Sequence, residues 1–333
     1  MLWAAACAPT PGVEARALYE LERLAFVPPA RCTLDDYTSW PFADCSLDRA
    51  IVFDRFELTR GDRTHYLPTG PGEERSLTWT TDAARDAPDR VDWPAYMDFR
   101  EAQAIATLRG MRLPTPREWI HVAVGRRGFA FPWGGRDNSL WANTRVVQKD
   151  EFGQRNDVSL KSPWTVGSFE NGRSRPFGCY DLLGNVWEWV DGVVPGDEPP
   201  LATDPRVDEL DDSNGTVASV LGGAFDTPLK PTFRRDGSRM PPLRFHARRL
   251  DKRTLSPSIG ARMCADAEPY LWQHAAEWGE GEDVRQRVRD VARRWAEDAL
   301  ARDELRSLLA ELCARPAAPA GILWLREGLE AGP

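Results

Sequence analysis

Residues that bind transition metals are scarce in this sequence, which has six cysteines and four histidines among 333 residues. No two cysteines have the C-x-x-C spacing, and no two histidines have the His-x-x-x-His spacing. A zinc knuckle, a thioredoxin-type redox site and a histidine pair on one helix are therefore not expected. We expect each histidine to be a surface or partly buried residue.

An excess of positive charge and long apolar runs are also lacking. The formal net charge is −8, which argues against a nucleic-acid-binding protein, because such proteins need a face rich in lysine and arginine. No apolar stretch approaches the roughly 20 residues that a membrane-spanning helix needs. With 42% hydrophobic residues, the composition predicts a soluble globular domain with a core.

Tryptophan, proline and glycine are abundant, with 14, 27 and 26 residues respectively. Stretches with regular hydrophobic periodicity are few before residue 265. Such a chain is expected to be rich in turns, with indole rings filling the space between loops.

Local sequence nevertheless predicts several elements. Residues 14–24 and 99–109 have helical patterns, and the second helix should end at Gly110, a good C-terminal cap. Residues 25–28 and 51–58 are typical of strands, as is the region around Cys32.

A further helix should begin at Thr115. This residue can accept a hydrogen bond at the helix N-terminus, Pro116 suits the first helical position, and Glu118 completes a capping box. The helix should end near Gly125.

The last part of the chain has a different pattern. Residues 282–313 have amphipathic periodicity, which fits one long helix or two shorter ones. Pro316 and Pro319 should end the helical region, and a short segment at 322–329 follows.

Several motifs occur in a characteristic order between residues 53 and 262. The two most specific are Arg112-Leu-Pro-Thr-Pro-Arg-Glu-Trp119 and Gly184-Asn-Val-Trp-Glu-Trp189, and Gly222-Gly-Ala-Phe225 and Ile259-Gly-Ala-Arg262 follow. In this order the motifs resemble the formylglycine-generating enzyme (sulfatase-modifying factor) family over residues 25–266.

The resemblance implies an α+β fold with little regular secondary structure, related to C-type lectin folds. Three parts are then expected: an N-terminal segment 1–24, a formylglycine-generating-enzyme-like domain 25–266, and a helical C-terminal extension 267–333.

The oxidases of this family bind copper(I) through two thiolates that follow the Gly-Gly-Ser-Phe motif. Thr227 and Thr232 stand at those two positions here, and no cysteine lies between Cys179 and Cys264. A threonine hydroxyl cannot replace the soft thiolate that copper(I) requires. We therefore do not expect a copper-dependent formylglycine-generating oxidase. The iron motif His-x-x-x-His-x-Glu of another enzymatic branch is absent too.

A calcium site is the family feature that this sequence retains. The resemblance implies four ligands around the Gly184–Trp189 motif: the side chains of Asp181 and Glu188 and the carbonyl groups of Gly184 and Val186. Calcium prefers several hard oxygen ligands of this kind. The alternative is that Asp181 caps a turn and Glu188 pairs with an arginine.

A second calcium site of the family would use four other residues here. They are Asn143, Thr144, Asp150 and Phe152. We expect calcium as the cofactor and no copper, haem or nucleotide.

The substrate groove of the family would pass six candidate residues, two of which are the threonines at the cysteine positions. They are Thr227, Thr232, Asp226, Arg234, Arg235 and Trp187. The alternatives are a surface ion pair for the charged residues and packing under loops for the tryptophan. Glu57 and Thr59 are expected to take part in a buried hydrogen-bond network.

Two functions fit these expectations. The first is a calcium-braced binding or scaffold domain for a peptide, a glycan or a partner protein. The second is an enzyme with a different, unidentified chemistry on a protein or peptide substrate in the groove.

The N-terminal residues leave the compartment open. The sequence Met1-Leu-Trp-Ala-Ala-Ala-Cys7 resembles the end of a bacterial lipoprotein signal, but it lacks a charged region and a full apolar region. If Cys7 is a lipid anchor, the protein is exported, and Cys32 and Cys45 can form a disulfide. If the protein is cytoplasmic, both are small buried hydrophobic residues.

Overall fold

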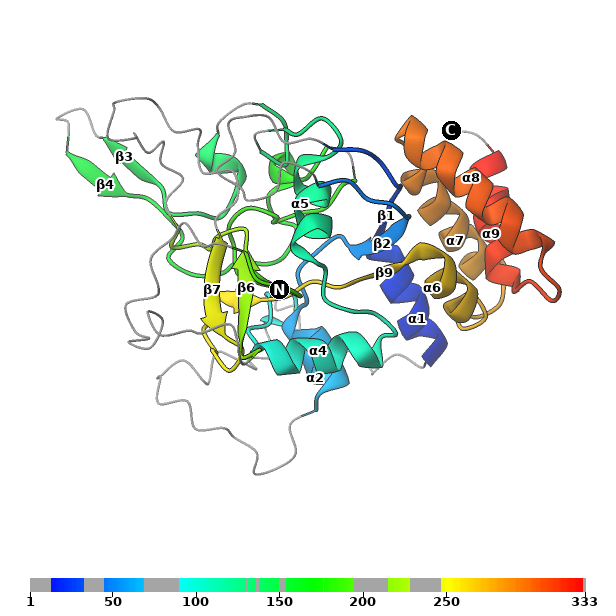
Figure 1. Ribbon diagram of the computed structural model, residues 1–333, viewed down its shortest axis with the longest axis horizontal. Helices are drawn as coiled ribbons and strands as arrows, with labels where there is room; N and C mark the ends of the chain where they lie inside the picture. The colour runs from blue at the N-terminus through cyan, green and yellow to red at the C-terminus, as the bar shows by residue number, and fades with distance from the viewer. Residues whose placement is uncertain are drawn as a thin grey trace, which may run out of the picture.

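The computed structural model combines short sheets with helices (Figure 1). It describes residues 13–32, 45–68, 90–129, 131–135, 138–149, 154–175, 177–194, 215–227 and 247–331. Six of the candidate site residues lie outside these ranges, namely Cys7, Asp150, Phe152, Thr232, Arg234 and Arg235. No helix of the described part is long and apolar enough to cross a membrane.

A three-stranded antiparallel sheet joins the two ends of the expected domain. It contains β1 (Leu24–Val27), β2 (Ile51–Asp54) and β9 (Cys264–Asp266), in the order β1-β2-β9. Every residue of β1 and β2 is buried. The predicted strand at 51–58 is shorter than expected, because the chain leaves the sheet after Asp54 and turns toward the next helix. Among the described residues near Cys32, the structure has an isolated bridge between Ala30 and Leu47 in place of the expected strand.

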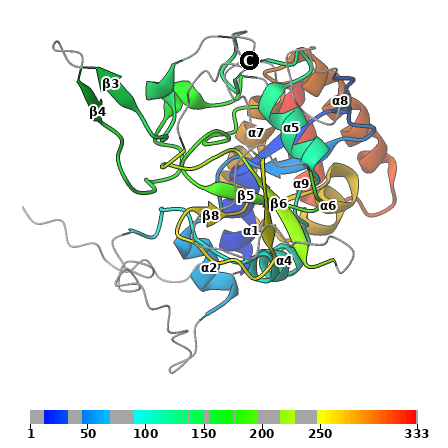
Figure 2. The same cartoon turned by 60° about the vertical axis from the view of Figure 1, so that its left-hand side comes forward.

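A four-stranded sheet carries the most specific motif. Its strands are β5 (Trp187–Val190), β6 (Val217–Leu221), β7 (Ala247–Asp251) and β8 (Ile259–Gly260), in the order β7-β6-β5-β8. Only β5 and β8 pair in parallel. The hairpin of β3 (Val147–Lys149) and β4 (Arg155–Asp157) projects from the body (Figure 2).

The described residues before the second sheet form α1 (Val13–Glu22), α2 (Arg60–Tyr66), α4 (Phe99–Leu108) and α5 (Pro116–Val124), with short 3₁₀ turns η2 (Ser139–Trp141) and η3 (Glu170–Gly172). Helices α1, α4 and α5 lie where the local sequence predicts them. The capping box predicted for α5 is confirmed, since Thr115 and Glu118 bond to each other's backbone N–H groups. Helix α2, which was not predicted, has a capping box of its own between Thr59 and Asp62.

Four helices follow the second sheet. They are α6 (Ala267–His274), α7 (Glu282–Trp295), α8 (Ala299–Ala314) and α9 (Ala320–Glu330). The amphipathic region 282–313 therefore forms two helices and not one, because Asp298 caps the start of α8.

These helices pack on the rest of the chain and share its core, beside α1 and the first sheet (Figure 1). The indole N–H of Trp295 donates a hydrogen bond to the carbonyl of Leu24 at 2.8 Å. Its ring lies 5.9 Å from that of Phe26. The C-terminal helices are thus part of one folding unit with β1.

We predict that Trp295→Ala lowers the free energy of unfolding by about 3–5 kcal/mol, because it opens a cavity between α7 and β1. Urea unfolding followed by circular dichroism measures this change. Leu323→Ala, on the exposed side of α9, is the matched control and should change stability by no more than about 0.5 kcal/mol. Equal effects of the two substitutions would contradict the shared core.

Candidate functional site

The loop that leads into β5 has an unusual backbone. Asp181, Gly184 and Asn185 all have positive φ, at 55°, 87° and 62°. A Cβ atom on Gly184 would lie 2.4 Å from the carbonyl oxygen of Asn143. Glycine is therefore required at 184 both for its backbone conformation and for the close approach of the two segments.

Glu188 is engaged in a buried ion pair. Its carboxylate receives two hydrogen bonds from Arg262, at 2.7 Å from Nε and 2.5 Å from Nη2, and a third at 2.6 Å from the indole of Trp119. Glu188 and Arg262 are 1% and 0% exposed. The alternative considered from the sequence, in which Glu188 pairs with an arginine, is the arrangement in the structure.

Glu57 lies in the turn that follows β2, and its side chain reaches the same loop. Its carboxylate accepts hydrogen bonds from the side-chain amide of Asn185 at 2.6 Å and from the backbone of Val186 at 3.1 Å. Burial, followed by the charges of Asp181 and Glu188, raises the pKa of Glu57 well above its ordinary value. The buried hydrogen-bond network predicted for Glu57 and Thr59 is confirmed, since Thr59 bonds to Asp62.

Asp181 is the third buried carboxyl group of this cluster. Its Oδ2 accepts a hydrogen bond from the backbone of Gly167 at 2.7 Å, so it does cap a turn. Burial raises the pKa of Asp181 to about 6. Asp181, Glu57 and Glu188 share one guanidinium group, that of Arg262, whose positive charge offsets only part of the effect of burial on the pKa values of Glu57 and Asp181.

The fit of a calcium ion to the four expected ligands is mixed. Glu188 does not fit, because the guanidinium of Arg262 neutralises its charge, and Arg262 and Trp119 together donate three hydrogen bonds to its two oxygens. Asp181 fits better, since its carboxylate is buried and compensated only in part. Glu57, which the expected ligand set did not include, accepts one hydrogen bond at each oxygen, and both donors are uncharged.

Asn143 and Thr144 lie against the same loop, and each is 2% exposed. The amide of Asn143 donates to the carbonyl of Ser162 and to Asn185. Asn143 Oδ1 and Thr144 Oγ1 have no hydrogen-bond partner among the described residues. Two buried oxygens without donors are compatible with a hard cation.

The groove candidates that the structure describes differ in their burial and contacts. The hydroxyl of Thr227, at the first family cysteine position, is buried and accepts a hydrogen bond from the backbone of Ala224 at 2.9 Å. Trp187 lies in the core and not on a groove wall, with Arg248 stacked 4.5 Å from its ring centre. Asp226 is exposed beside this turn.

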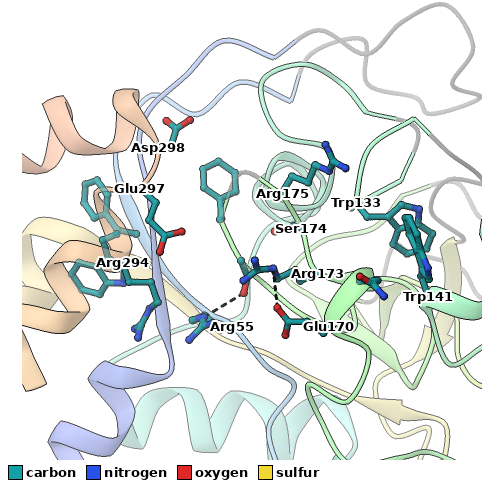
Figure 3. Close-up of a pocket in the computed structure, with 15 residues that line it drawn as sticks. Arg55, Trp133, Trp141, Glu170, Arg173, Ser174, Arg175, Arg294, Glu297 and Asp298 are labelled. Carbon is teal, nitrogen blue, oxygen red and sulfur yellow. Dashed lines mark hydrogen bonds and ion pairs between the residues drawn. The ribbon is translucent and has the colours of Figure 1, made fainter. Parts of the chain in front are cut away.

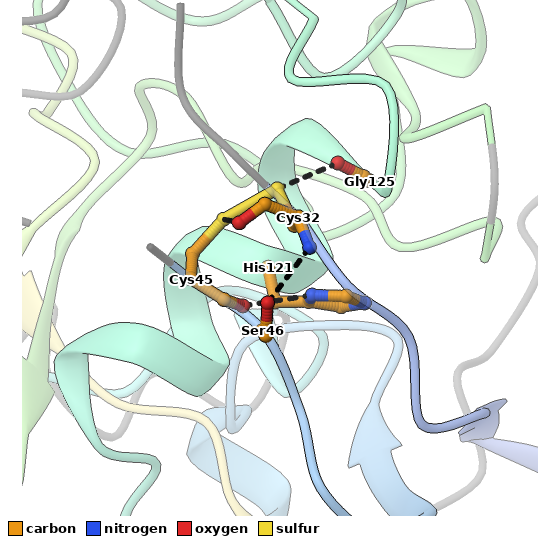
Figure 4. The surroundings of a disulfide bond; sticks show 5 residues. All are labelled: Cys32, Cys45, Ser46, His121 and Gly125. Carbon is orange, nitrogen blue, oxygen red and sulfur yellow. Dashed lines mark hydrogen bonds between the residues drawn. A yellow bond between two sulfur atoms is a disulfide. The ribbon is translucent and has the colours of Figure 1, made fainter. Parts of the chain in front are cut away.

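Cys32 and Cys45 form a disulfide close to His121 (Figure 4). Sulfur and nitrogen atoms of the three residues lie within 4.8 Å of one another. A disulfide sulfur is not a thiolate, so this group does not bind a thiophilic metal while the disulfide is intact. His121 is completely buried, contrary to the expectation of a surface or partly buried residue, and burial lowers its pKa.

Reasoning from single motifs missed Arg262 and Asn185, which organise the site. Both belong to the quoted motifs, but only the fold shows that Arg262 reaches Glu188 and that Asn185 reaches Glu57. The sequence feature that could have identified them is a polar residue, arginine or asparagine, within an otherwise apolar and glycine-rich motif.

Comparison with known proteins gives the family. The model of the sulfatase-modifying factor enzyme 1-like domain matches residues 20–240. Because this match spans more than half of the chain, the protein belongs to the formylglycine-generating enzyme family.

Relatives include proteins named as formylglycine-generating enzymes and proteins named as inactive members of the family. The formylglycine-generating enzyme of Mycobacterium tuberculosis is 37% identical over 111 residues, which are 32% of this chain and 35% of the relative. The inactive C-alpha-formylglycine-generating enzyme 2 of Mus musculus is 33% identical over 153 residues, or 42% and 46% of the two chains. The chain thus spans less than half of these relatives. Among solved structures, PvdO from Pseudomonas aeruginosa has a TM-score of 0.45 at 18% identity, covering 73% of this chain and 94% of that chain.

We predict that Arg262→Met lowers the free energy of unfolding by about 3–5 kcal/mol, because it leaves Glu188 buried without a cationic partner beside two other carboxyl groups. Urea unfolding at pH 7 measures the loss. The matched control is Arg253→Met, whose ion pair with Asp251 is at the surface and should contribute no more than about 1 kcal/mol. A loss at Arg262 as small as that of the control would contradict the role of the ion pair.

Proposed function

We propose that this chain is a non-oxidase member of its family that acts as a calcium-braced binding or scaffold domain for a peptide, a glycan or a partner protein. The observation that carries the proposal is the burial and the hydrogen bonding of the Thr227 side chain. Its hydroxyl is buried and holds the turn at Ala224, so this side chain serves the backbone at the position where the oxidases use a thiolate.

The absence of cysteine from the segment that holds the copper ligands in the oxidases also supports this proposal. No cysteine stands between Cys179 and Cys264 in the sequence. Both of these cysteines are buried, and burial raises the pKa of each thiol. Thiols of this kind are poor sources of the thiolate that binds copper(I). Relatives named as inactive family members occur in Mus musculus and Bos taurus.

Calcium would have a structural role in this domain. Asp181 and the carbonyl groups of Gly184 and Val186 would hold the ion, with Glu57 in place of the engaged Glu188. The ion would supply the positive charge that Asp181 and Glu57 lack in the interior. A second ion would use the unpartnered oxygens of Asn143 and Thr144.

We expect no oxidation of a cysteine-containing peptide by the purified protein after incubation with copper(I) under oxygen. Mass spectrometry of the peptide detects the aldehyde product, and an active formylglycine-generating enzyme run in parallel is the control. Copper-dependent aldehyde formation would overturn the proposal.

We predict that calcium stabilises the protein more at pH 7 than at pH 5. The folded-state pKa of Asp181, about 6, lies above its ordinary value of 3.8. The folded state therefore binds more protons than the unfolded state in this interval, and stability without metal falls as the pH rises from about 4 to 6. This loss is up to about 3 kcal/mol, and bound calcium should remove it. Thermal unfolding with calcium or with chelator at the two pH values measures the difference.

The matched variants are Asp181→Asn and Asp226→Asn. Asparagine tolerates the positive φ at 181 and can still accept the hydrogen bond from Gly167. Asp181→Asn should raise the melting temperature of the metal-free protein at pH 7 and abolish the calcium effect. Asp226→Asn, at an exposed position, should leave both unchanged. A full calcium effect in Asp181→Asn would contradict the site.

A further inference from the structure

A cavity of about 540 Å³ lies between the C-terminal helices and the loops before β5. One wall comes from the end of α7 and the start of α8, with Arg294, Glu297 and Asp298 (Figure 3). The opposite wall carries Arg173 and Arg175 from the loop after η3, together with the ring of Trp141 from η2. This cavity is distinct from the Glu57–Asp181 cluster and from the turn at Thr227, neither of which lines it.

Two half-buried arginines meet at the floor of the cavity. Arg55 is held by a hydrogen bond from its Nε to the carbonyl of Gly178 at 3.3 Å and by the ring of Phe56. Arg294 donates from Nη2 to the carbonyls of Glu22 and Leu24, at 2.8 and 3.4 Å. Among the described residues, no carboxylate forms an ion pair with either arginine.

The positive charge of Arg294 is poorly compensated. Its Nε is buried and lacks a hydrogen-bond partner within the described part of the chain. Burial, followed by the like charge of Arg55, lowers the pKa of Arg294 to about 10. The nearby Glu22 is bound by Arg287 through two hydrogen bonds. An anion in the cavity would relieve this repulsion.

The other charged groups of the lining are mostly paired. Arg173 bonds to Glu170 at 3.3 Å, and Asp298 caps α8 and lies 3.7 Å from Arg126. Among the described residues of the lining, three guanidinium groups and one carboxylate have no ion pair to another described residue. They are Arg55, Arg175, Arg294 and Glu297. The surplus of two positive charges matches a dianion such as a phosphate monoester.

The cavity is larger than a phosphate group needs, and its volume falls in the range of roughly 300–1,000 Å³ typical of small-molecule sites. Five aromatic residues line it: Phe26, Trp133 and Trp295 are buried, whereas Trp141 and Phe177 are half-buried. Flat rings stack on such side chains.

We propose that this cavity binds a small molecule that carries a phosphate group on a flat ring. The phosphate lies between Arg55 and Arg294, and the ring lies against Trp141 and Phe177. Since α7 supplies Arg294, the site requires the C-terminal helices, which follow the matched family domain. The proposal does not depend on calcium binding or on the absence of oxidase activity.

Isothermal titration with phenyl phosphate, inorganic phosphate and benzoate, in low-chloride buffer, tests the proposal. Phenyl phosphate should bind at least tenfold more tightly than either of the others, because it alone has both a dianion and a ring. No binding of phenyl phosphate, or binding no tighter than that of inorganic phosphate, would overturn the proposal.

Substitutions locate the ligand. Arg55→Gln and Arg294→Gln should each weaken phenyl phosphate binding by about tenfold to a hundredfold. Arg293→Gln, on the same helix and paired with Asp290, is the matched control and should leave the affinity unchanged. Equal affinities in all three variants would contradict the site.

If the glutamine variants fail to fold, lysine variants of Arg55 and Arg294 keep the charge and the aliphatic stem but lose the two-pronged donor. They should still weaken binding. In the unmodified protein, the Nε–H resonance of Arg294 in nitrogen-15 NMR should shift on addition of phenyl phosphate. An unchanged resonance at saturating ligand would overturn the proposal.

Discussion

The guanidinium group of Arg262 is the interaction on which the rest of the structure depends. It donates to both oxygens of Glu188 on β5, to the carbonyl of Tyr180 at 2.8 Å, and to the carbonyl of Asp54 on β2 at 3.2 Å. It therefore joins the two main sheets and the loop between the family motifs through one side chain. A fully buried arginine is tolerated only when its donors are satisfied in this way, since an unpaired buried charge is strongly destabilising.

The three buried carboxyl groups near Arg262 differ in how far their charge is compensated. Because Arg262 compensates Glu188, it compensates Glu57 and Asp181 only in part, and their pKa values rise. The interior then requires either a proton or a cation beside these two groups. Glu188 of the family motif thus holds the sheets together, whereas Asp181 and Glu57 beside it are buried carboxyl groups with raised pKa values.

The sequence predicted those elements that depend on interactions between residues close together in the chain. The start of α5 depends on Thr115, Pro116 and Glu118, which are neighbours in the chain, and the structure has this helix as expected. The helix α2 also had a local signal in Thr59 and Asp62, but it has only seven residues and includes a glycine, so its periodicity is weak. Contacts between distant segments were beyond such reasoning. Glu188 and Arg262 are 74 residues apart, and nothing in either motif states that their side chains meet.

The position of the C-terminal helices was equally beyond local reasoning, and it affects what the domain presents to solvent. Amphipathic periodicity indicates that α7 has an apolar face, but it does not identify the surface that covers this face. The structure places it on β1, where Trp295 and Arg294 both bond to the carbonyl of Leu24. Strand β1 pairs with β2, whose end is fixed by Arg262 through Asp54. The residue after Asp54 is Arg55. The same sheet that anchors the buried ion pair therefore sets the positions of Arg55 and Arg294 relative to each other. With the C-terminal helices in place, a loop surface of the family domain becomes one wall of a cavity that both arginines line.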